Sequence, residues 1–535
     1  MTDPEIRERT WVLAVDCSTT GSKVAVIDTD GRTVASGAAP LTTDSPRPGW
    51  HEQDAGAWWP ATDRAVRLAL AQLVDAGRGA ELSRIAGICV AHQRETFVLV
   101  DETNRPLQPA ILWLDGRAAV EIEELGTPEV ERLCGKPADI TPALYKLAWL
   151  HRHQPELLDR AHRVVDTHAF LVRELTGAWA TSLSSADPLA LIDITTRDYS
   201  PALLAIAGVR FDQLPALHEA GAVIAPLDPE LAAAWGLQAD VAVIAGLGDG
   251  QAAGVGAQVF DPTTAYLNVG TALLIGTECR GYTPSRAYRT LLSVNPGQTT
   301  LETFLSSGTY LPTWFRRRFG PAEAAGAPDP ELEAAAAAVP AGSGGLLTVP
   351  YWNAAQTPHW DPHASGLMLG WRGNHTKAHV YRSLLEGIAQ EVRLQLDGLE
   401  AATGVRVQSL RAMGGGIRSP LFSQILADVL ERPLELCAEP EISALGAAVV
   451  AMVGLGVYPD LPAAAAAMTR TGDTVRPDPA VAASYRRLRG LHAQLYPRLK
   501  DLMRDLDAFV SDDAEQHAVT TRPPTVSRTS RQGAP

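Results

Sequence analysis

Two similar hairpins occur far apart in this chain, and this repetition limits its fold more than any other feature. The segment WVLAVDCSTTGSKVAVIDTDGRTVASG at 11–37 predicts three short strands, separated by the turn-forming stretches STTGS and DTDG. From Ala265, the segment AYLNVGTALLIG repeats the pattern of a strand, a small-residue turn at Gly270–Thr271 and a second strand. An internal duplication of one structural unit is therefore predicted.

Helix signals support regular structure around these hairpins. A helix is expected over 56–76, with Gly77 just past its end. Another is expected over 420–430, where Ser419 is a natural N-cap and Pro420 fits the first helical position. The second helix carries its apolar residues on one face, which predicts that it packs on a core.

The composition is that of a folded protein with several packed units. The 535 residues are 46% hydrophobic and 20% charged, and a chain of this length normally forms about two to four units. There are 46 basic and 61 acidic residues, a net charge of −15, and no basic stripe, so nucleic-acid binding is not expected. An acidic protein can still bind phosphates, because helix N-termini and loop amides hold them locally.

The sequence also favours a cytoplasmic location. Its five cysteines are widely spaced and form no CxxC pair, which is typical of a reducing compartment. The first residues, MTDPEIRERTWV, are too charged for a signal peptide, and no run of about 18 apolar residues occurs without Gly, Pro or charge. We therefore expect no membrane partner.

The first segment with chemical potential is DCSTTGSK, from Asp16 to Lys23. A tight turn of small hydroxyl residues presents backbone N–H groups and hydroxyls to an anion such as a phosphate. Asp16 could hold Mg²⁺ through water, because magnesium prefers oxygen ligands and keeps several waters. Lys23 could reach a phosphate that is being transferred. The alternative is an ordinary hairpin turn with a solvated lysine.

The second segment is GLGDGQAAGVGA at 246–257, where Asp249 lies between glycines at a strand-to-helix turn. Its carboxylate could accept the proton of an attacking hydroxyl, since a substrate can approach such a backbone closely. A dinucleotide fingerprint is a rival interpretation. However, the glycines at 248, 250 and 254 have GxGxxxG spacing, not GxGxxG, and no acidic ribose partner stands out. A plain helix-start turn is also possible.

The third segment is MGGGIRSPLFSQILADVL, in which three glycines precede the helix that begins after Ser419. Successive glycines let the backbone lie flat against a planar ring or a phosphate, although glycine triplets also occur in plain loops. A P-loop is excluded, because GxxxxGK[ST] does not occur; the one Gly-Lys pair, Gly135–Lys136, is followed by proline.

The fourth segment combines HQRETFVLVD with ILWLDGRA. It contains Arg94, Glu95, Trp113, Asp115 and Arg117. Polyhydroxylated ligands need this pairing, since charged groups bind the hydroxyls while an aromatic ring packs on the C–H face. Surface ion pairs are the alternative.

In their order along the chain, these segments resemble the FGGY carbohydrate kinases, over roughly residues 11–495. DCSTTGSK is similar to the family's first phosphate loop, GWHEQDAGAWW to its early helix lead-in and VGTALL to its second phosphate loop. GGGIRSPLFSQILADVLERPLEL followed by EISALGAAVVA is similar to its adenosine-binding region and C-terminal signature.

The resemblance implies an α/β chain with the two-domain actin/hexokinase/Hsp70-like (ribonuclease H-like) fold and a nucleotide cleft between the domains. It places an N-terminal domain at 11–255, a C-terminal domain at 256–500 and a disordered tail at 511–535. ATP and Mg²⁺ are the implied cofactors, and a small sugar or polyol is the implied partner. No nucleic acid or membrane is implied, and a homodimer is one oligomeric state to consider.

The resemblance also implies roles for single residues. Asp249 matches the catalytic base and Asp16 the metal-associated aspartate. The expected substrate-binding residues are Arg94, Glu95, Trp113, Asp115, Arg117 and Gln251. The expected nucleotide-binding residues are Ser18, Thr19, Thr20, Lys23, Gly270, Thr271, Gly414, Gly415, Gly416 and Arg418.

The acceptor remains open at this stage. PYWNAAQTPHWDPHASG and the adenosine region are closest to xylulokinase-like members, which favours a ketopentose such as xylulose. QRET at 93–96 is similar to the glycerol-kinase acceptor motif and favours a polyol such as glycerol or erythritol. TRDYSPALLAIAGV and SVNPG are similar to the branch that phosphorylates autoinducer-2. An actin-fold ATPase without a small acceptor, and a Rossmann oxidoreductase, are rivals of other classes.

Overall fold

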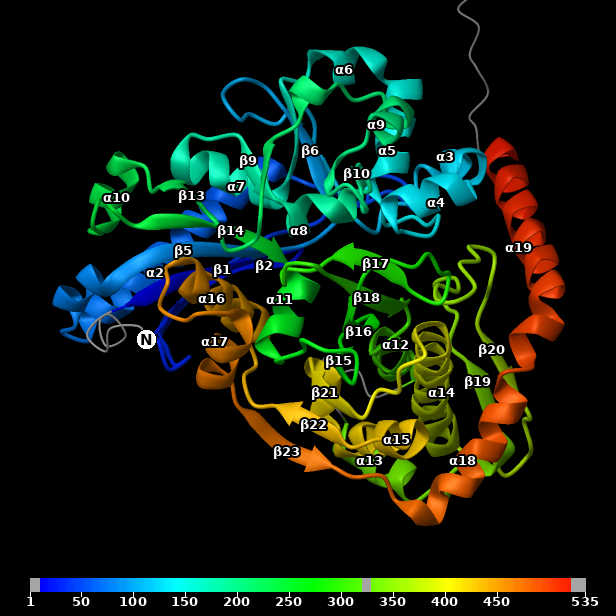
Figure 1. Cartoon of the computed structure of the whole chain (residues 1–535). Helices are drawn as coiled ribbons and strands as arrows, with labels where there is room; N and C mark the ends of the chain where they lie inside the picture. Colours follow the sequence, from blue (N-terminus) through cyan, green and yellow to red (C-terminus); the bar gives the residue numbers. More distant parts are fainter. Residues whose placement is uncertain (1–9, 320–328, 521–535) are drawn as a thin grey trace, which may run out of the picture.

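Two mixed β-sheets lie at the centre of the molecule (Figure 1). The computed structural model describes residues 10–319 and 329–520. The first sheet has the order β13-β14-β5-β1-β2-β3. Its strands are β1 (Trp11–Ser18), β2 (Gly21–Ile27), β3 (Thr33–Pro40), β5 (Ile85–His92), β13 (Val223–Pro226) and β14 (Ala242–Gly248). β1 pairs antiparallel with β2 and parallel with β5, and β5 pairs parallel with β14.

The second sheet repeats this arrangement, with the order β17-β18-β16-β15-β21-β22-β23. Its strands are β15 (Thr264–Val269), β16 (Leu273–Arg280), β17 (Arg289–Leu292), β18 (Gln298–Leu305), β21 (Ser409–Met413), β22 (Leu434–Cys437) and β23 (Thr471–Val475). β15 pairs antiparallel with β16 and parallel with β21, and β21 pairs parallel with β22. The duplication predicted from the two hairpins is therefore confirmed.

Helices cover both sheets and join them. α2 (Trp58–Asp75) packs on β2 and β3, and the long α14 (Lys377–Thr403) packs on β16 and β18. α11 (Asp249–Gly256) and α16 (Ile442–Gly454) pack against each other between the sheets (Figure 1). α16 also shares a buried cluster with β1, β5 and β14. A helix from the C-terminal part of the chain thus completes the core of the first sheet.

Helix boundaries follow the signals in the sequence. α15 (Pro420–Leu430) begins as predicted, because the Ser419 hydroxyl accepts a hydrogen bond from the Phe422 N–H at 3.0 Å. Gly77 follows α2 and Gly404 follows α14, both with φ near +70°, a backbone conformation that residues with a side chain rarely adopt (74° and 68°).

The remaining elements form an outer layer on each half. Between β3 and β14 they are β4 (Glu52–Gln53), β6 (Phe97–Val100), β7 (Ala110–Ile111), α3 (Ala119–Leu125), α4 (Pro128–Cys134), α5 (Ala143–His153), α6 (Pro155–Arg160), β8 (Arg163–Asp166), α7 (Thr167–Thr176), β9 (Ala180–Ser182), α8 (Leu183–Ala186), β10 (Ile192–Asp193), β11 (Asp198–Tyr199), α9 (Pro201–Ala207), β12 (Ala216–His218) and α10 (Pro229–Trp235). Later ones are α12 (Tyr310–Phe319), α13 (Pro330–Ala337), β19 (Leu347–Val349), β20 (Leu367–Leu369), α17 (Leu461–Met468) and α18 (Pro479–His492).

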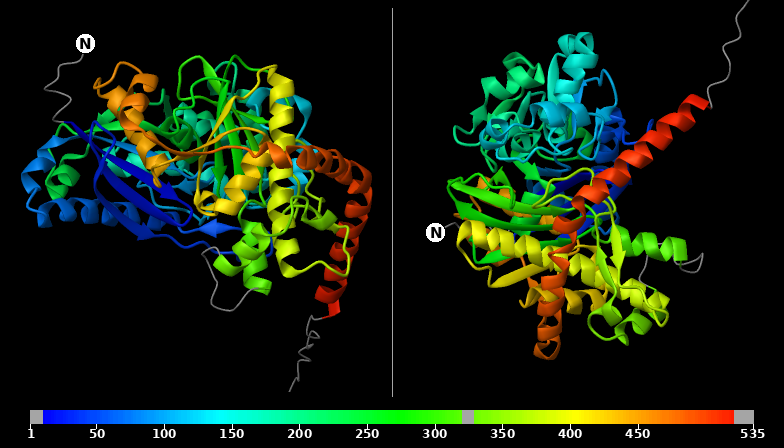
Figure 2. Two further views of the ribbon diagram at one scale, coloured as in Figure 1. Left: turned by 90° about the horizontal axis from the view of Figure 1, so that it is seen from below. Right: turned by 90° about the vertical axis from the view of Figure 1, so that its right-hand side faces the viewer.

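The C-terminal end differs from the expectation. α19 (Leu495–Thr520) is a long helix on the outside of the molecule (Figure 2), so the first part of the predicted tail at 511–535 is helical. The segment SDDAEQHAVT at 511–520 contains no Gly or Pro, and nothing in it ends a helix. The rest of the predicted tail, 521–535, lies outside the described residues. Among the described helices, none is long and apolar enough to cross a bilayer.

Candidate active site

Asp249 is the first residue of α11, directly after β14. Its side chain is 44% exposed, and Arg94 Nε lies 3.1 Å from its Oδ1. The same oxygen accepts a hydrogen bond from the Gly250 N–H at 2.7 Å. The flanking glycines are needed for this contact, because a Cβ on Gly248 would lie 2.5 Å from Arg94 Cγ and one on Gly250 2.8 Å from Arg94 Nη2. A half-exposed carboxylate is thus held in a fixed orientation.

A second carboxylate, Asp16 on β1, is close enough to interact with Asp249. Burial and, to a smaller extent, the negative charge of Asp249 together raise the pKa of Asp16 to about 7. Its Oδ1 is buried and has no hydrogen-bond partner among the described residues. A buried carboxylate oxygen without a donor, beside a second carboxylate, is suited to a divalent cation.

The side chains of Gln93 and Trp113 hold the first hairpin turn on one side. Ser18 ends β1, and Thr19 and Thr20 form the turn before β2. The Thr19 hydroxyl donates to Gln93 Oε1 at 3.0 Å and accepts from Trp113 Nε1 at 3.3 Å. Thr20 is exposed. The turn is therefore anchored on one side and open on the other.

Lys23, on β2 just after this turn, contacts the C-terminal part of the chain. Its Nζ donates to Glu441 Oε1 at 2.8 Å, and both side chains are about half-exposed. Glu441 precedes α16. Lys23 thus links the first hairpin to α16, and a contact of Lys23 with a phosphate stays a prediction.

The second hairpin turn, at Gly270 and Thr271, is braced by the start of α12. The Thr309 N–H and hydroxyl both donate to the Gly270 carbonyl, at 2.9 and 2.8 Å. Gly308 lies directly against the turn, since a Cβ there would be 2.9 Å from the Gly270 oxygen. The turn is rigidly placed, while Thr271 itself is exposed.

A cavity of about 410 Å³ lies beside the second hairpin. It is lined by Thr309, Pro312, Thr313, Arg316, Glu333, Tyr381, Leu385, Gly415, Gly416, Arg418, Ser419 and Phe422. Three of the predicted nucleotide-binding residues, Gly415, Gly416 and Arg418, are therefore on its wall. Gly416 must be glycine, because a Cβ would lie 2.4 Å from Val269 Cγ1. Gly414 has φ of 92° and lies just outside this lining set.

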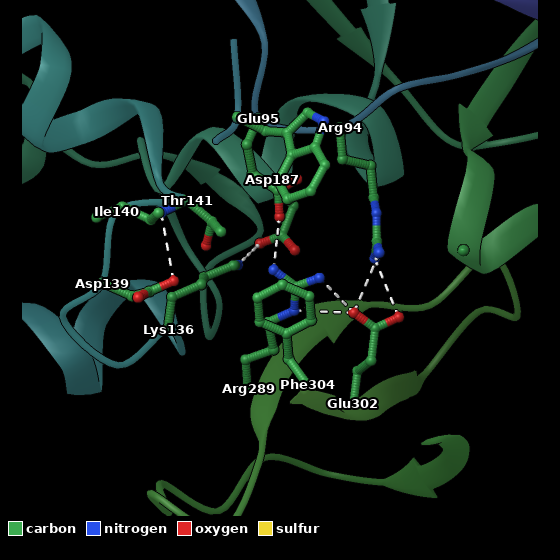
Figure 3. A network of polar contacts seen from close by, with 12 residues as sticks. Arg94, Glu95, Lys136, Asp139, Ile140, Thr141, Asp187, Arg289, Glu302 and Phe304 are labelled. Atoms are coloured by element: carbon green, nitrogen blue, oxygen red, sulfur yellow. Dashed lines mark hydrogen bonds and ion pairs between the residues drawn. The ribbon is translucent and has the colours of Figure 1, made fainter. Parts of the chain in front are cut away.

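Four buried charges from both halves of the chain meet in one network (Figure 3), and one of them, Arg94, contacts Asp249. Arg94 Nη2 lies 3.1 Å from Glu302 Oε1, and Arg289 Nε donates to the same oxygen at 2.8 Å. Arg289 Nη1 also donates to Glu95 Oε1 at 2.8 Å. We call these four residues the charge quartet. Arg94 and Glu95 follow β5, whereas Arg289 is on β17 and Glu302 on β18, so the quartet joins the two sheets.

Glu302 is the centre of the quartet, and its side chain is fully buried. Burial alone would raise its pKa, but the positive charges of Arg94 and Arg289 outweigh this effect and lower the pKa to about 2. The Tyr266 hydroxyl donates to its other oxygen at 2.5 Å. Glu302 therefore stays ionised and fixes both guanidinium groups.

The other predicted substrate residues fall into two groups. The ring of Trp113 is half-buried and lies edge-on to Phe304 of β18, with centroids 6.5 Å apart. Asp115 and Arg117 are instead buried and bonded to each other, with Arg117 Nε donating to Asp115 Oδ1 at 2.8 Å. Their charges hold the loop together; neither side chain is open to a ligand in this structure.

Gln251 lies on α11, two residues beyond Asp249. It is buried, and its amide N–H donates to the Ser184 carbonyl at 3.0 Å. Its Oε1 is buried without a hydrogen-bond partner among the described residues. One acceptor atom two residues beyond Asp249 is therefore left without a hydrogen-bond donor.

Comparison with known protein families matches both halves of this chain. Residues 11–256 match the N-terminal domain, and residues 265–455 the C-terminal domain, of the FGGY family of carbohydrate kinases. The chain belongs to this family. It is a carbohydrate kinase, an enzyme that transfers a phosphoryl group from ATP to a sugar.

Two groups of relatives in this family are similar over most of the chain. Xylulose kinase of Escherichia coli (strain K12) is 30% identical, over 92% of this chain and 99% of the relative. Glycerol kinase of Bordetella parapertussis is 31% identical, over 84% of this chain and 90% of the relative. The crystal structure of xylulose kinase from Rhodospirillum rubrum has a TM-score of 0.83 at 30% identity and covers 92% of this chain and 99% of its own. The predicted actin/hexokinase-like two-domain fold is thereby confirmed.

Several residues that shape the site were not predicted from the sequence. Arg289 and Glu302 complete the charge quartet, and Glu333 accepts a hydrogen bond from the Ser419 hydroxyl at 2.7 Å in the cavity wall. Glu333 is in an alanine-rich helix and Arg289 in a short strand, without any motif. Only the three-dimensional fold brings these residues to the site.

Proposed function

We propose that this kinase phosphorylates a hydroxyl of a ketopentose such as xylulose, with Asp249 as the general base. The observation that carries the proposal is the oriented, half-exposed Asp249 carboxylate beside the charge quartet. The similarity to xylulose kinases over almost the whole chain supports a ketopentose as the acceptor.

In the proposed mechanism, Asp249 accepts the proton of the acceptor hydroxyl while Arg94 Nε holds the carboxylate in place. The hydroxyl oxygen attacks the γ-phosphorus of ATP, and the bond to the β-phosphate oxygen breaks in line. Gln251 Oε1 accepts a hydrogen bond from a neighbouring hydroxyl, and the ring of Trp113 packs on the C–H face of the sugar. Backbone amides of the two hairpins, at Thr19–Thr20 and Gly270–Thr271, donate to the phosphates.

Magnesium fits this arrangement. Asp16 would hold Mg²⁺, through water, because its buried Oδ1 has no donor and its neighbour Asp249 is also negative. Bound there, the ion would neutralise charge on the ATP phosphates. No cluster of three or more His, Cys, Asp or Glu side chains suited to a metal occurs within residues 10–319 and 329–520.

A polyol is the second candidate acceptor, and one observation favours it. The Arg94–Glu95 pair lies beside Asp249, and glycerol kinases are among the similar relatives. In this structure both side chains are engaged by Arg289 and Glu302, so a polyol would have to compete with these ion pairs. An autoinducer-2 precursor is a third acceptor to test.

An ADP-release screen with purified protein identifies the acceptor. Xylulose, ribulose, glycerol, erythritol and an autoinducer-2 precursor are compared at equal concentration. We expect the highest kcat/KM for a ketopentose. A polyol that exceeds every ketopentose would overturn the proposed acceptor while leaving the kinase assignment intact.

The cavity at Gly415 gives a test of the ATP site. A Cβ on Gly415 meets no heavy atom within 4 Å, so a side chain there would project into open space without disturbing the fold. We expect Gly415→Leu to raise the KM for ATP about tenfold or more, with the melting temperature and the acceptor KM unchanged. Gly490→Leu is the matched control, since Gly490 on α18 is equally open. An unchanged ATP KM in Gly415→Leu would place the nucleotide elsewhere.

The homodimer, the cytoplasmic location and the domain boundary at 255–256 stay predictions. The boundary is close to the end of the first family match and the start of the second. However, α16 belongs to the C-terminal half by sequence and packs on the first sheet.

A further inference from the structure

Lys146 on α5 is a buried lysine with an unusual set of partners. The three N–H groups of its Nζ are shared among four carbonyl oxygens, those of Leu112 (3.1 Å), Trp113 (3.2 Å), Ile140 (3.0 Å) and Thr141 (3.0 Å). The residue is only 1% exposed. One ammonium group thus joins two main-chain segments, 112–113 and 140–141, which we call the carbonyl cage.

Burial of an ammonium group is energetically unfavourable unless other interactions compensate for the loss of its hydration. Burial lowers the pKa of Lys146 to about 8, while the negative charges of Asp115, Glu95 and Asp139 favour the charged form. Within the part of the chain that the structure describes, Nζ forms no ion pair with a carboxylate; four carbonyl oxygens surround it instead. Removal of the ammonium would leave these oxygens without its hydrogen bonds in a dry region, which is strongly unfavourable.

The segment held by Lys146 carries the aromatic wall of the acceptor side. The Trp113 N–H donates to the Thr96 hydroxyl at 3.2 Å, and its indole N–H donates to Thr19 in the first hairpin. Its ring faces Phe304 of β18. Trp113 therefore links the first hairpin to the second half of the chain, and Lys146 fixes its main chain.

The other segment lies close to the charge quartet. Figure 3 draws Asp139, Ile140 and Thr141 in the same view as Arg289 and Glu302, with Asp139 accepting a hydrogen bond from the Thr141 N–H. Asp139 interacts electrostatically with Arg289. Lys146 thus connects the main chain of Trp113 with the segment that contains Asp139, which interacts with Arg289 of the quartet.

We propose that Lys146 is a positioning residue, which sets the distance between the Trp113 wall and the 139–141 segment and thereby the affinity for the acceptor. The proposal rests on the proposed function for its kinetic consequence. Lys146 does not touch the reacting atoms; it acts through the main chain of Trp113. The carbonyl cage is also a site that a small monovalent ammonium ion fits when the side chain is removed.

The test compares Lys146→Ala with the wild-type enzyme in acceptor and ATP kinetics. We expect the acceptor KM to rise about 10- to 100-fold, because small misplacements of substrate-positioning groups have effects of this size. The KM for ATP should change less than the acceptor KM, since neither 112–113 nor 140–141 lines the cavity at Gly415 and Gly416. Ammonium chloride should lower the acceptor KM of Lys146→Ala, and tetramethylammonium chloride should not. Lys146→Arg keeps a charged donor, so its acceptor KM should lie between those of the wild-type enzyme and Lys146→Ala. This variant keeps the test informative if Lys146→Ala does not fold.

Leu150→Ala is the matched control. Leu150 is buried one turn further along α5 and makes none of the four hydrogen bonds. It should lower the melting temperature but leave the acceptor KM nearly unchanged. Equal effects of Lys146→Ala and Leu150→Ala on the acceptor KM would overturn the positioning role.

Hydrogen–deuterium exchange separates this proposal from the proposed function, because it needs no turnover. We expect faster exchange at 112–115 and 139–142 in Lys146→Ala, reversed by ammonium, and no such local change in Leu150→Ala. Unchanged exchange at both segments would contradict the proposal. Absence of phosphorylation of any acceptor by the wild-type protein would instead contradict the proposed function.

Discussion

Replacement of Asp249 by asparagine is expected to lower kcat for acceptor phosphorylation by about 10²–10⁴, the usual effect of losing a general base. Asparagine has the same shape, and its side-chain oxygen can still accept from Arg94 Nε and the Gly250 N–H. It cannot accept a proton from the acceptor hydroxyl. ATP affinity should therefore be unchanged, because the cavity lined by Gly415 and Gly416 is not altered.

The measurement combines steady-state kinetics with a binding titration of an ATP analogue. Asp240→Asn is the matched control: Asp240 is exposed and lies just before β14, at the end opposite Asp249. It should have wild-type kcat and KM. Near-wild-type phosphorylation by Asp249→Asn would remove Asp249 from the role of base, even if the protein is a kinase.

Replacement of Glu302 by glutamine is expected to destabilise the whole chain. The change leaves the buried guanidinium groups of Arg94 and Arg289 without their common carboxylate, and breaking a buried ion pair typically costs about 3–5 kcal/mol. Since Arg94 also orients Asp249, acceptor turnover should fall as well. Urea unfolding gives the change in free energy, and ADP release gives the change in turnover.

Glu278→Gln is the matched control for this prediction. Glu278 is also buried in the second sheet, but it accepts a hydrogen bond from the Thr300 hydroxyl at 2.6 Å and forms no ion pair with an arginine of the described residues. Burial raises its pKa to about 6, so the neutral form is already favoured relative to an exposed glutamate. Neutralising it should change stability little. Equal losses in Glu302→Gln and Glu278→Gln would contradict the special role of the quartet.

The quartet also predicts how stability depends on pH. The pKa of Glu302 is about 2 in the folded chain against an ordinary value of 4.5, so the unfolded state binds the proton more readily. The stabilisation from Glu302 is therefore complete above pH 4.5 and is lost as the pH falls towards 2. Glu302→Gln should lack this component of the acid-induced loss of stability, measured as the free energy of unfolding against pH.

Local signals in the sequence predicted the framework of this fold. The hairpin before β3, the cap at Ser419 and the strand-to-helix turn at Asp249 depend on neighbouring residues, so each could be recognised from its own segment. The repeated hairpin at Gly270–Thr271 indicated the duplication that the second sheet confirms.

Non-local contacts could not be predicted in this way. Arg94 and Glu302 are 208 residues apart, and no motif surrounds Glu302 or Arg289. Asp115 and Arg117 are charged residues of the kind that binds ligands, yet in this structure they form an ion pair with each other. The same charges can serve either purpose, and only the three-dimensional fold determines which. The polar composition of 511–520 suggested disorder, whereas α19 extends to Thr520 through a segment without a helix-breaking residue.

We propose that this carbohydrate kinase moves the γ-phosphoryl group of ATP onto a sugar hydroxyl with Asp249 as the general base. Phosphorus NMR of a reaction with xylulose, run in parallel with the wild-type enzyme and Asp249→Asn, tests it most directly. We predict that the wild-type enzyme forms one sugar phosphate for each ADP and that Asp249→Asn forms almost none. Inorganic phosphate in place of a sugar phosphate, or equal sugar phosphate from both proteins, would contradict it.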